Sequence, residues 1–116
     1  MKSKKPARMN IQLSAMDVDA ILCALPLISY YDTGSDIQNQ INFDLMNSAM
    51  DKLSTKNSGF LPNEYRVIYT AVALAVNIET HLSGIEIAAE WKAELKRHFF
   101  TLNRIHALTK DMIYQR

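Results

Sequence analysis

Three side chains that could bind a metal ion or move a proton stand four residues apart in the sequence: Glu90, Glu94 and His98. A spacing of four places such residues along one edge of a helix. Bundles that hold two iron ions use a Glu-x-x-His spacing and take further carboxylates from other helices, and this sequence offers neither. One cysteine and scattered histidines also match no zinc-ligand spacing. We therefore expect neither a metal nor a cofactor.

His98 and Glu79 are the two polar residues that the sequence predicts to face the interior of the fold. His98 falls in the apolar repeat of the C-terminal segment, and antiparallel pairing with the preceding helix places it opposite Tyr69 or Thr70. The same pairing brings Glu79 near Lys92. Since buried polar groups normally find hydrogen-bonding partners, we interpret His98 as a core histidine and Glu79 as half of a structural ion pair. The functional alternative is that His98 binds a ligand or takes part in catalysis, and that Glu79 is a general base with a raised pKa.

The single cysteine, Cys23, cannot form an internal disulfide, so the chain is not a disulfide-stabilised secreted scaffold. Its neighbours are apolar, with two aspartates one turn earlier, whereas a nucleophilic thiol needs a base and a positively charged environment. The three glycines are isolated and form no phosphate-binding loop. The longest apolar run has twelve residues, whereas a membrane span needs about 20. We expect a non-enzymatic protein of a reducing, cytoplasmic compartment, with no membrane partner.

Charged residues are unevenly distributed, although the net charge is only +1. Residues 1–9 carry four Lys or Arg and no acid, and residues 10–91 carry three Lys or Arg against ten Asp or Glu. Residues 92–116 carry six Lys or Arg against two acids. A basic arm and a basic helix face could follow a phosphate backbone. The residues that would make this nucleic-acid contact are Lys4, Lys5, Arg8, Lys96, Arg97, Arg104 and Lys110.

Nucleic-acid binding remains the alternative function rather than the leading one. The same basic residues can form an ordinary solvated helix face and a tail that rests on the acidic middle of the chain. Proteins that hold single strands stack the bases on exposed aromatic rings. We expect Phe99 and Phe100 to lie beside the apolar core stripe, where they would not serve this purpose.

Residues 1–8 are predicted to form a flexible basic tail, and residues 9–116 a single helical domain. An extended lead-in precedes the first helix, but one short strand has nothing obvious to pair with. Ser14 begins the first helix by capping the backbone N–H of Asp17, and Pro26 kinks or ends it. Ser35 begins the second helix in the same way. That helix is expected to bury an apolar stripe made of Ile37, Ile41, Leu45, Ala49 and Leu53.

Pro62 suits the first turn of a third helix, which Gly84 should end. Residues 85–114 contain no Gly or Pro, and their apolar residues alternate spacings of three and four. This pattern predicts one long helix, with a break near Phe100 as the alternative. The expected fold is all-α, a four-helix bundle built from two antiparallel helical hairpins with a long C-terminal helix.

The last helix would be about 45 Å long and the third only about 30 Å, at about 1.5 Å per residue. The apolar residues predicted to overhang the third helix are Ile105, Leu108, Met112, Ile113 and Tyr114. Such a surface must be covered, by a second copy of the chain or by the first helix. We favour the second copy, most simply in a dimer. The sequence therefore predicts a non-enzymatic helical protein–protein interaction module that self-associates.

Overall fold

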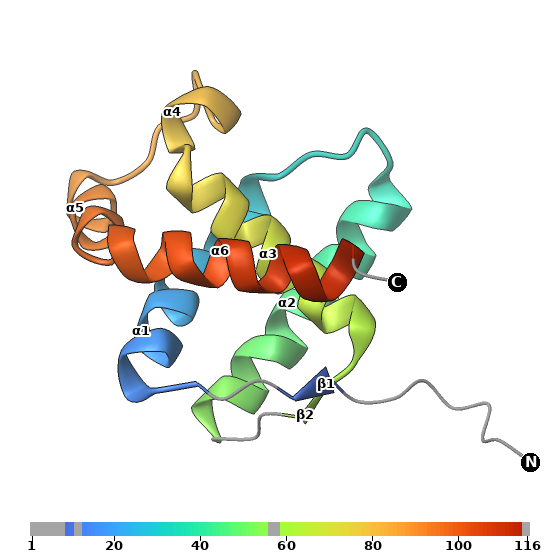
Figure 1. The fold of residues 1–116 in the computed structure, drawn as a ribbon. Coiled ribbons are helices and arrows are strands. Elements are labelled where there is room, and N and C mark those ends of the chain that lie inside the picture. Colours follow the sequence, from blue (N-terminus) through green and yellow to red (C-terminus); the bar gives the residue numbers. More distant parts are fainter. Residues whose placement is uncertain (1–8, 11–12, 56–58, 115–116) are drawn as a thin grey trace, which may run out of the picture.

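α3 (Pro62–Val76) is the helix against which most other elements pack in the computed structural model, which describes residues 9–10, 13–55 and 59–114. Its neighbours are α1 (Ala15–Ala24), the 3₁₀ helix η1 (Leu25–Tyr30), α2 (Asp36–Ser54) and α6 (Phe99–Tyr114). Figure 1 shows α6 crossing in front of α3. The other elements are short: α4 (Ile78–His81), α5 (Ala89–Arg97), and the strands β1 (Met9–Asn10) and β2 (Gly59–Phe60). The described chain is mostly helical, which confirms the all-α class.

The bundle of two helical hairpins is not confirmed, because the segment predicted as the third helix is interrupted. α3 ends at Val76, where Asn77 takes φ −144° and ψ 57°, and the single turn of α4 follows. Gly84 then adopts φ +83°, a left-handed conformation that favours glycine. Gly84 therefore lies beyond the C-cap of α4, which is Leu82, and the predicted third helix already ends at Val76.

The predicted single helix over residues 85–114 is wrong, because α5 and α6 are separated at His98. The backbone of His98 has φ −94° and ψ 11°, and its N–H is shared between the carbonyl oxygens of Glu94 and Leu95, each 3.2 Å away. Figure 1 shows α5 turned away from the axis of α6 at the left of the view. The alternative break that the sequence allowed near Phe100 therefore exists, but it comes slightly earlier in the chain.

Local capping sets the starts of α1 and α2 as predicted. Ser14 Oγ accepts a hydrogen bond from the Asp17 N–H at 3.1 Å, and an Asp17 carboxylate oxygen accepts one from the Ser14 N–H at 3.0 Å. The two residues form a capping box. Ser35 Oγ accepts a hydrogen bond from the Gln38 N–H at 3.2 Å where α2 begins. Because Pro26 has no backbone N–H to donate, α1 gives way to η1 just before it.

The apolar stripe predicted for α2 is buried only in the second half of the helix. Ala49 and Leu53 lie in the core together with Met46. In the first half, however, Ile41 is 44% exposed and Ile37 is 76% exposed. An open groove separates this half of α2 from α3, so no neighbouring helix covers the two isoleucines. The prediction that they belong to the core is therefore wrong.

The lead-in to α1 has a partner that the sequence did not reveal. β1 and β2 pair in antiparallel fashion, with Met9 opposite Phe60 and Asn10 opposite Gly59. The prediction of an unpaired lead-in is therefore wrong, because the chain just before α3 supplies the second strand. Phe60 is fully buried next to Tyr65, with the two ring centroids 5.5 Å apart in an edge-to-face arrangement.

Side chains from several helices form one apolar core. Its largest fully buried apolar members are Tyr65, Phe60, Ile21, Leu25, Leu27, Ile68, Leu102 and Ile105. Ile105 was predicted to overhang the fold and to form an interface, yet it is 0% exposed because α6 packs against α1 as well as α3. The alternative expectation, that the first helix covers this part of the C-terminal segment, is confirmed for Ile105.

The burial of Ile105 predicts its contribution to stability. Ile105→Ala should lower the free energy of unfolding by about 2–5 kcal/mol, because it leaves a cavity between α1, α3 and α6. Leu108→Ala is the matched control on the same helix. Since Leu108 is 37% exposed, its loss should cost about 1 kcal/mol or less. Urea unfolding followed by circular dichroism compares the two, and equal losses would contradict this assignment of the core.

Candidate interaction surfaces

The buried groups that could act as nucleophiles or proton donors are poorly suited to that role. Cys23 is half-buried, and burial together with the nearby Glu94 raises the pKa of its thiol. Tyr65 is buried, its hydroxyl has no hydrogen-bonding partner within the described structure, and desolvation raises its pKa to about 12. Both groups are therefore protonated at neutral pH. Among the described residues, no three His, Cys, Asp or Glu side chains gather closely enough to hold a metal ion.

His98 does not occupy the core position predicted for it. It is half-buried at the junction of α5 and α6, and His106 stacks on Tyr69 instead, with ring centroids 5.1 Å apart and planes at 9°. The break at His98 causes this shift, because α6 begins only after it and α6 is the helix that packs on α3. Burial, with Lys110 and His81 nearby, lowers the pKa of His106 and keeps its imidazole neutral at pH 7.

Glu79 has the partner that the sequence predicted but not the predicted burial. Lys92 Nζ lies 3.4 Å from a Glu79 carboxylate oxygen, which confirms the ion pair. The Glu79 side chain is 80% exposed, however, because the break at Asn77 turns α4 away from the line of α3. The prediction that Glu79 faces the interior of the fold is therefore wrong.

Glu64 is a buried carboxylate that sequence reasoning missed. Its Oε1 accepts hydrogen bonds from Lys52 Nζ at 2.6 Å and from the Leu61 N–H at 2.7 Å, and its Oε2 accepts one from Ser48 Oγ at 2.5 Å. Burial alone would raise the pKa of Glu64, but these hydrogen bonds outweigh it and lower the pKa. A Glu at the third position of a helix that begins with Pro62 is a capping signal, and this signal could have identified Glu64 from the sequence. Glu64 joins α2 to α3.

Asp17 is the second buried acid, and it engages one of the predicted nucleic-acid residues. The Arg104 guanidinium donates a hydrogen bond to the Asp17 carboxylate, which ties α6 to the first turn of α1. Arg97 forms an ion pair with Glu94 one turn earlier on α5. Two of the predicted phosphate-binding side chains are therefore already paired with acids of the same chain.

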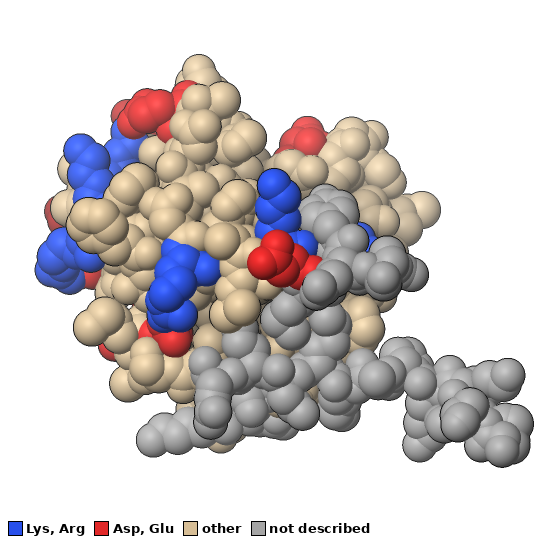
Figure 2. Space-filling model, viewed as in Figure 1, with Lys and Arg blue, Asp and Glu red and all other residues tan. Residues whose placement is uncertain are grey.

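The other predicted basic contacts differ in their surroundings. Lys96 and Lys110 are exposed and have no ion-pair partner among the residues that the structure describes. Lys4, Lys5 and Arg8 lie outside the described residues, and so do the side chains of Met112, Ile113 and Tyr114. Figure 2 shows Lys and Arg at the left of the view, on the side where α5 lies in Figure 1, and again near its middle. Lys92, Lys96 and Arg97 are the basic residues of α5.

Two phenylalanines stand beside these cations at the start of α6. Phe99 is 46% exposed and Phe100 is 87% exposed, and their ring centroids lie 5.9 Å apart in an edge-to-face arrangement. The expectation that both lie against the core is wrong, because Leu102 and Ile105 form the buried side of α6 and the two rings lie outside it. We call this surface the elbow, defined by Lys96, Arg97, Phe99 and Phe100.

A second exposed apolar surface covers the first half of α2. Ile37, Ile41 and Phe43 are its exposed apolar side chains, and Asp36 and Asp44 are its exposed acids. At 100° per residue, Asp44 lies within about 60° of both Ile37 and Ile41 around the helix, whereas Phe43 and Asp36 lie about 160° and 140° from Ile41. The chain from residue 10 to residue 51 contains six aspartates and no Lys or Arg. We call the surface formed by Ile37, Ile41 and Asp44 the α2 face.

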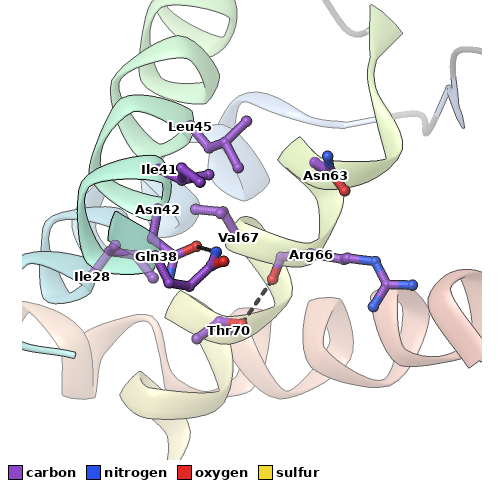
Figure 3. A pocket seen from close by; sticks show the side chains of 9 residues that line it. All are labelled: Ile28, Gln38, Ile41, Asn42, Leu45, Asn63, Arg66, Val67 and Thr70. Atoms are coloured by element: carbon purple, nitrogen blue, oxygen red, sulfur yellow. Dashed lines mark hydrogen bonds between the residues drawn. The ribbon is translucent and has the colours of Figure 1, made fainter. Parts of the chain in front are cut away.

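An open groove of about 330 Å³ runs beside the α2 face, between α2 and α3. Figure 3 shows Ile41, Leu45 and Val67 on its walls, with the Arg66 side chain directed away from them. Gln38 Nε2 donates a hydrogen bond to Asn42 Oδ1 at 2.9 Å on the α2 side. The groove therefore combines an apolar wall with amide groups that can exchange hydrogen bonds with a partner.

Trp91 holds α5 against the N-terminal helices. Its indole N–H donates a hydrogen bond to the Cys23 carbonyl oxygen at 2.8 Å, and its ring centroid lies 6.0 Å from that of Tyr30. Because the tryptophan bridges α5 to α1 and η1, the elbow at the end of α5 has a fixed position relative to the core.

No family model, no curated protein and no solved structure matches the chain. In the part of the chain that the structure describes, no helix is both long enough and apolar enough to cross a membrane.

The hydrogen bonds of Glu64 predict a pH-dependent contribution to stability. Since its pKa is lowered in the folded state, the contribution is present above the unfolded-state pKa of about 4.3 and is lost as pH falls through the folded-state value. Glu64→Gln should lower the free energy of unfolding by about 2 kcal/mol at pH 7, because Lys52 loses its buried partner. Urea unfolding at pH 7 and near pH 3 measures this cost. A cost that does not shrink at the lower pH would contradict the assignment.

Proposed function

We propose that this chain is a non-enzymatic helical protein–protein interaction module that self-associates through the α2 face. The observation that carries the proposal is the exposure of Ile37 and Ile41 on a helix whose other half is packed in the core. Exposed apolar groups clustered beside a groove and rimmed by polar residues are typical of protein interaction sites. A single half-buried thiol suits a reducing, cytoplasmic compartment, which is part of the proposal.

The proposed interface lies on α2 rather than at the end of α6. Ile105 is fully buried within its own chain and cannot contact a partner, and Leu108 is only 37% exposed. Ile37 is exposed by 76%, about twice as much as Leu108. Burying an exposed Ile or Phe contributes about 1.5–3 kcal/mol, whereas association costs about 4 kcal/mol or more in lost translation and rotation. A surface of this size therefore supports roughly micromolar association rather than a permanent dimer.

Removing the apolar groups of the α2 face should abolish self-association. The double variant Ile37→Asp and Ile41→Asp should remain monomeric at concentrations where the wild-type chain associates, because it places charge where apolar surface must be buried. Both residues are exposed, so the variant should keep its fold. Sedimentation equilibrium from roughly 10 μM to roughly 200 μM measures the association.

Met16→Asp is the matched control, because Met16 is 63% exposed on α1 and lies outside both surfaces. This variant should associate as the wild-type chain does. A wild-type chain that stays monomeric throughout the concentration range, or a double variant that still associates, would contradict the proposal.

Nucleic-acid binding is the second candidate function, and the observation that favours it is the exposed pair of rings at the elbow. Phe100 and Phe99 stand beside Lys96 and Arg97, which is the combination that stacks bases and neutralises phosphates in single-strand binders. The ion pair between Arg97 and Glu94 works against it, because it must be exchanged for a phosphate contact.

Binding of a fluorescent oligothymidine, measured by anisotropy, distinguishes this second function. Phe100→Ala should weaken binding roughly tenfold or more by removing a stacking platform. Deleting residues 1–8 should weaken it further and reduce its dependence on salt. Absence of any binding at low salt would rule this function out.

A further inference from the structure

The elbow and the α2 face are complementary in charge as well as apolar in character. The elbow presents the side chains of Lys96 and Arg97 beside two exposed phenylalanines. The α2 face presents Asp44 beside the exposed Ile37 and Ile41. Figure 1 shows α5 and the start of α6 at one side of the molecule and the first turns of α2 at the other. One copy of the chain therefore presents the two surfaces in different directions.

Neither surface is suited to pair with its own copy. In a two-fold symmetric contact a patch meets the same patch of its partner, so Asp44 of one α2 face would approach Asp44 of the other. Like charges brought together across an interface are repulsive and count against that arrangement. The same repulsion applies to Lys96 and Arg97 when two elbows meet. Contact between unlike surfaces places each charge opposite its counterion.

We propose that the self-association put forward above, on which this inference rests, is head-to-tail: the elbow of one copy docks on the α2 face of the next. Phe100, the most exposed of the large apolar side chains described, enters the groove between α2 and α3. That groove measures about 330 Å³, and a cavity of about 150 Å³ already holds benzene. Ile41 and Val67 supply apolar contacts for the ring.

The charged residues of the elbow then meet Asp44 of the α2 face. Lys96 has no ion-pair partner among the described residues and can bond directly to Asp44. Arg97 is paired with Glu94 within its own chain. A guanidinium carries five N–H donors, so Arg97 can keep Glu94 and still donate to an aspartate of the neighbouring copy. The contact therefore needs no buried charge to be left unpaired.

In a head-to-tail contact, one chain contributes its elbow and its neighbour contributes its α2 face. The first copy keeps a free α2 face and the last keeps a free elbow, so the assembly grows as concentration rises unless its rotation closes a ring. Because the paired charges remain near solvent, growth should weaken as ionic strength increases. A symmetric dimer would instead stop at two chains.

Two variants, each with one surface disabled, test the proposal. The elbow variant carries Lys96→Glu and Phe100→Ser, and the face variant carries Ile37→Ser and Asp44→Lys. Each alone should lose association by roughly tenfold or more, since each lacks one half of the contact. An equimolar mixture should form a one-to-one dimer that does not grow, because only one intact elbow and one intact α2 face remain. Light scattering in line with size-exclusion chromatography measures the masses.

Two controls test whether assembly depends on the elbow and the α2 face alone. Lys110→Glu reverses an exposed base of α6 outside the elbow and should leave assembly unchanged. A chain lacking residues 1–8 should also assemble, and loss of assembly in that chain would mean that the basic N-terminal segment occupies the α2 face, which overturns the proposal. Circular dichroism should show the same helix content in all variants.

The outcomes distinguish this inference from the function on which it rests. A mixture that stays monomeric overturns the head-to-tail contact. A wild-type chain that stops at a dimer, with the elbow variant dimerising equally well, also overturns it while leaving self-association intact. A wild-type chain that is monomeric at every concentration removes both proposals. Chains that grow beyond a dimer, together with a capped dimer in the mixture, support it.

Discussion

Leu102 and Ile105 are buried where α6 packs against α1 and α3. Their burial fixes the direction of α6. The chain before Phe99 takes a different direction: the helix breaks at His98, and Trp91 of α5 donates a hydrogen bond to the Cys23 carbonyl oxygen of α1. With Leu102 and Ile105 on the buried side of α6, the rings at its start lie in solvent. Burial of a few aliphatic groups thus decides where the exposed aromatic surface lies.

Two buried carboxylates fix how the helices are joined. Glu64 binds Lys52 and Ser48 of α2 from the start of α3, and Asp17 binds Arg104 of α6 from the start of α1. Each lies in the first turn of its helix, where a negative charge also stabilises the free N–H groups of the helix end. A buried carboxylate whose oxygens are occupied by donors is stabilising in its charged form. These two acids therefore join α3 to α2 and α1 to α6.

The sequence predicted what local chemistry controls. Ser14 and Ser35 begin helices, Pro26 ends one and Pro62 starts another, because capping and the missing proline N–H act over a few residues. It failed where distant packing decides. The apolar spacing continues through His98 without a Gly or Pro, so only the docking of α6 on α3 reveals the break. Ile37 and Ile41 keep the helical period of buried residues although no neighbouring helix covers them. For this reason the sequence did not reveal that the elbow and the α2 face are exposed.

Trp91 is the only tryptophan in the chain, and its position gives the molecule a built-in optical probe. Its indole N–H is bonded to Cys23 on α1, its ring lies near Tyr30 on η1, and it belongs to the helix that leads into the elbow. Indole emission responds to the polarity and hydrogen bonding around the ring. The fluorescence of the unlabelled protein therefore reports whether α5 is seated on the N-terminal helices, separately from the unfolding of the rest of the core.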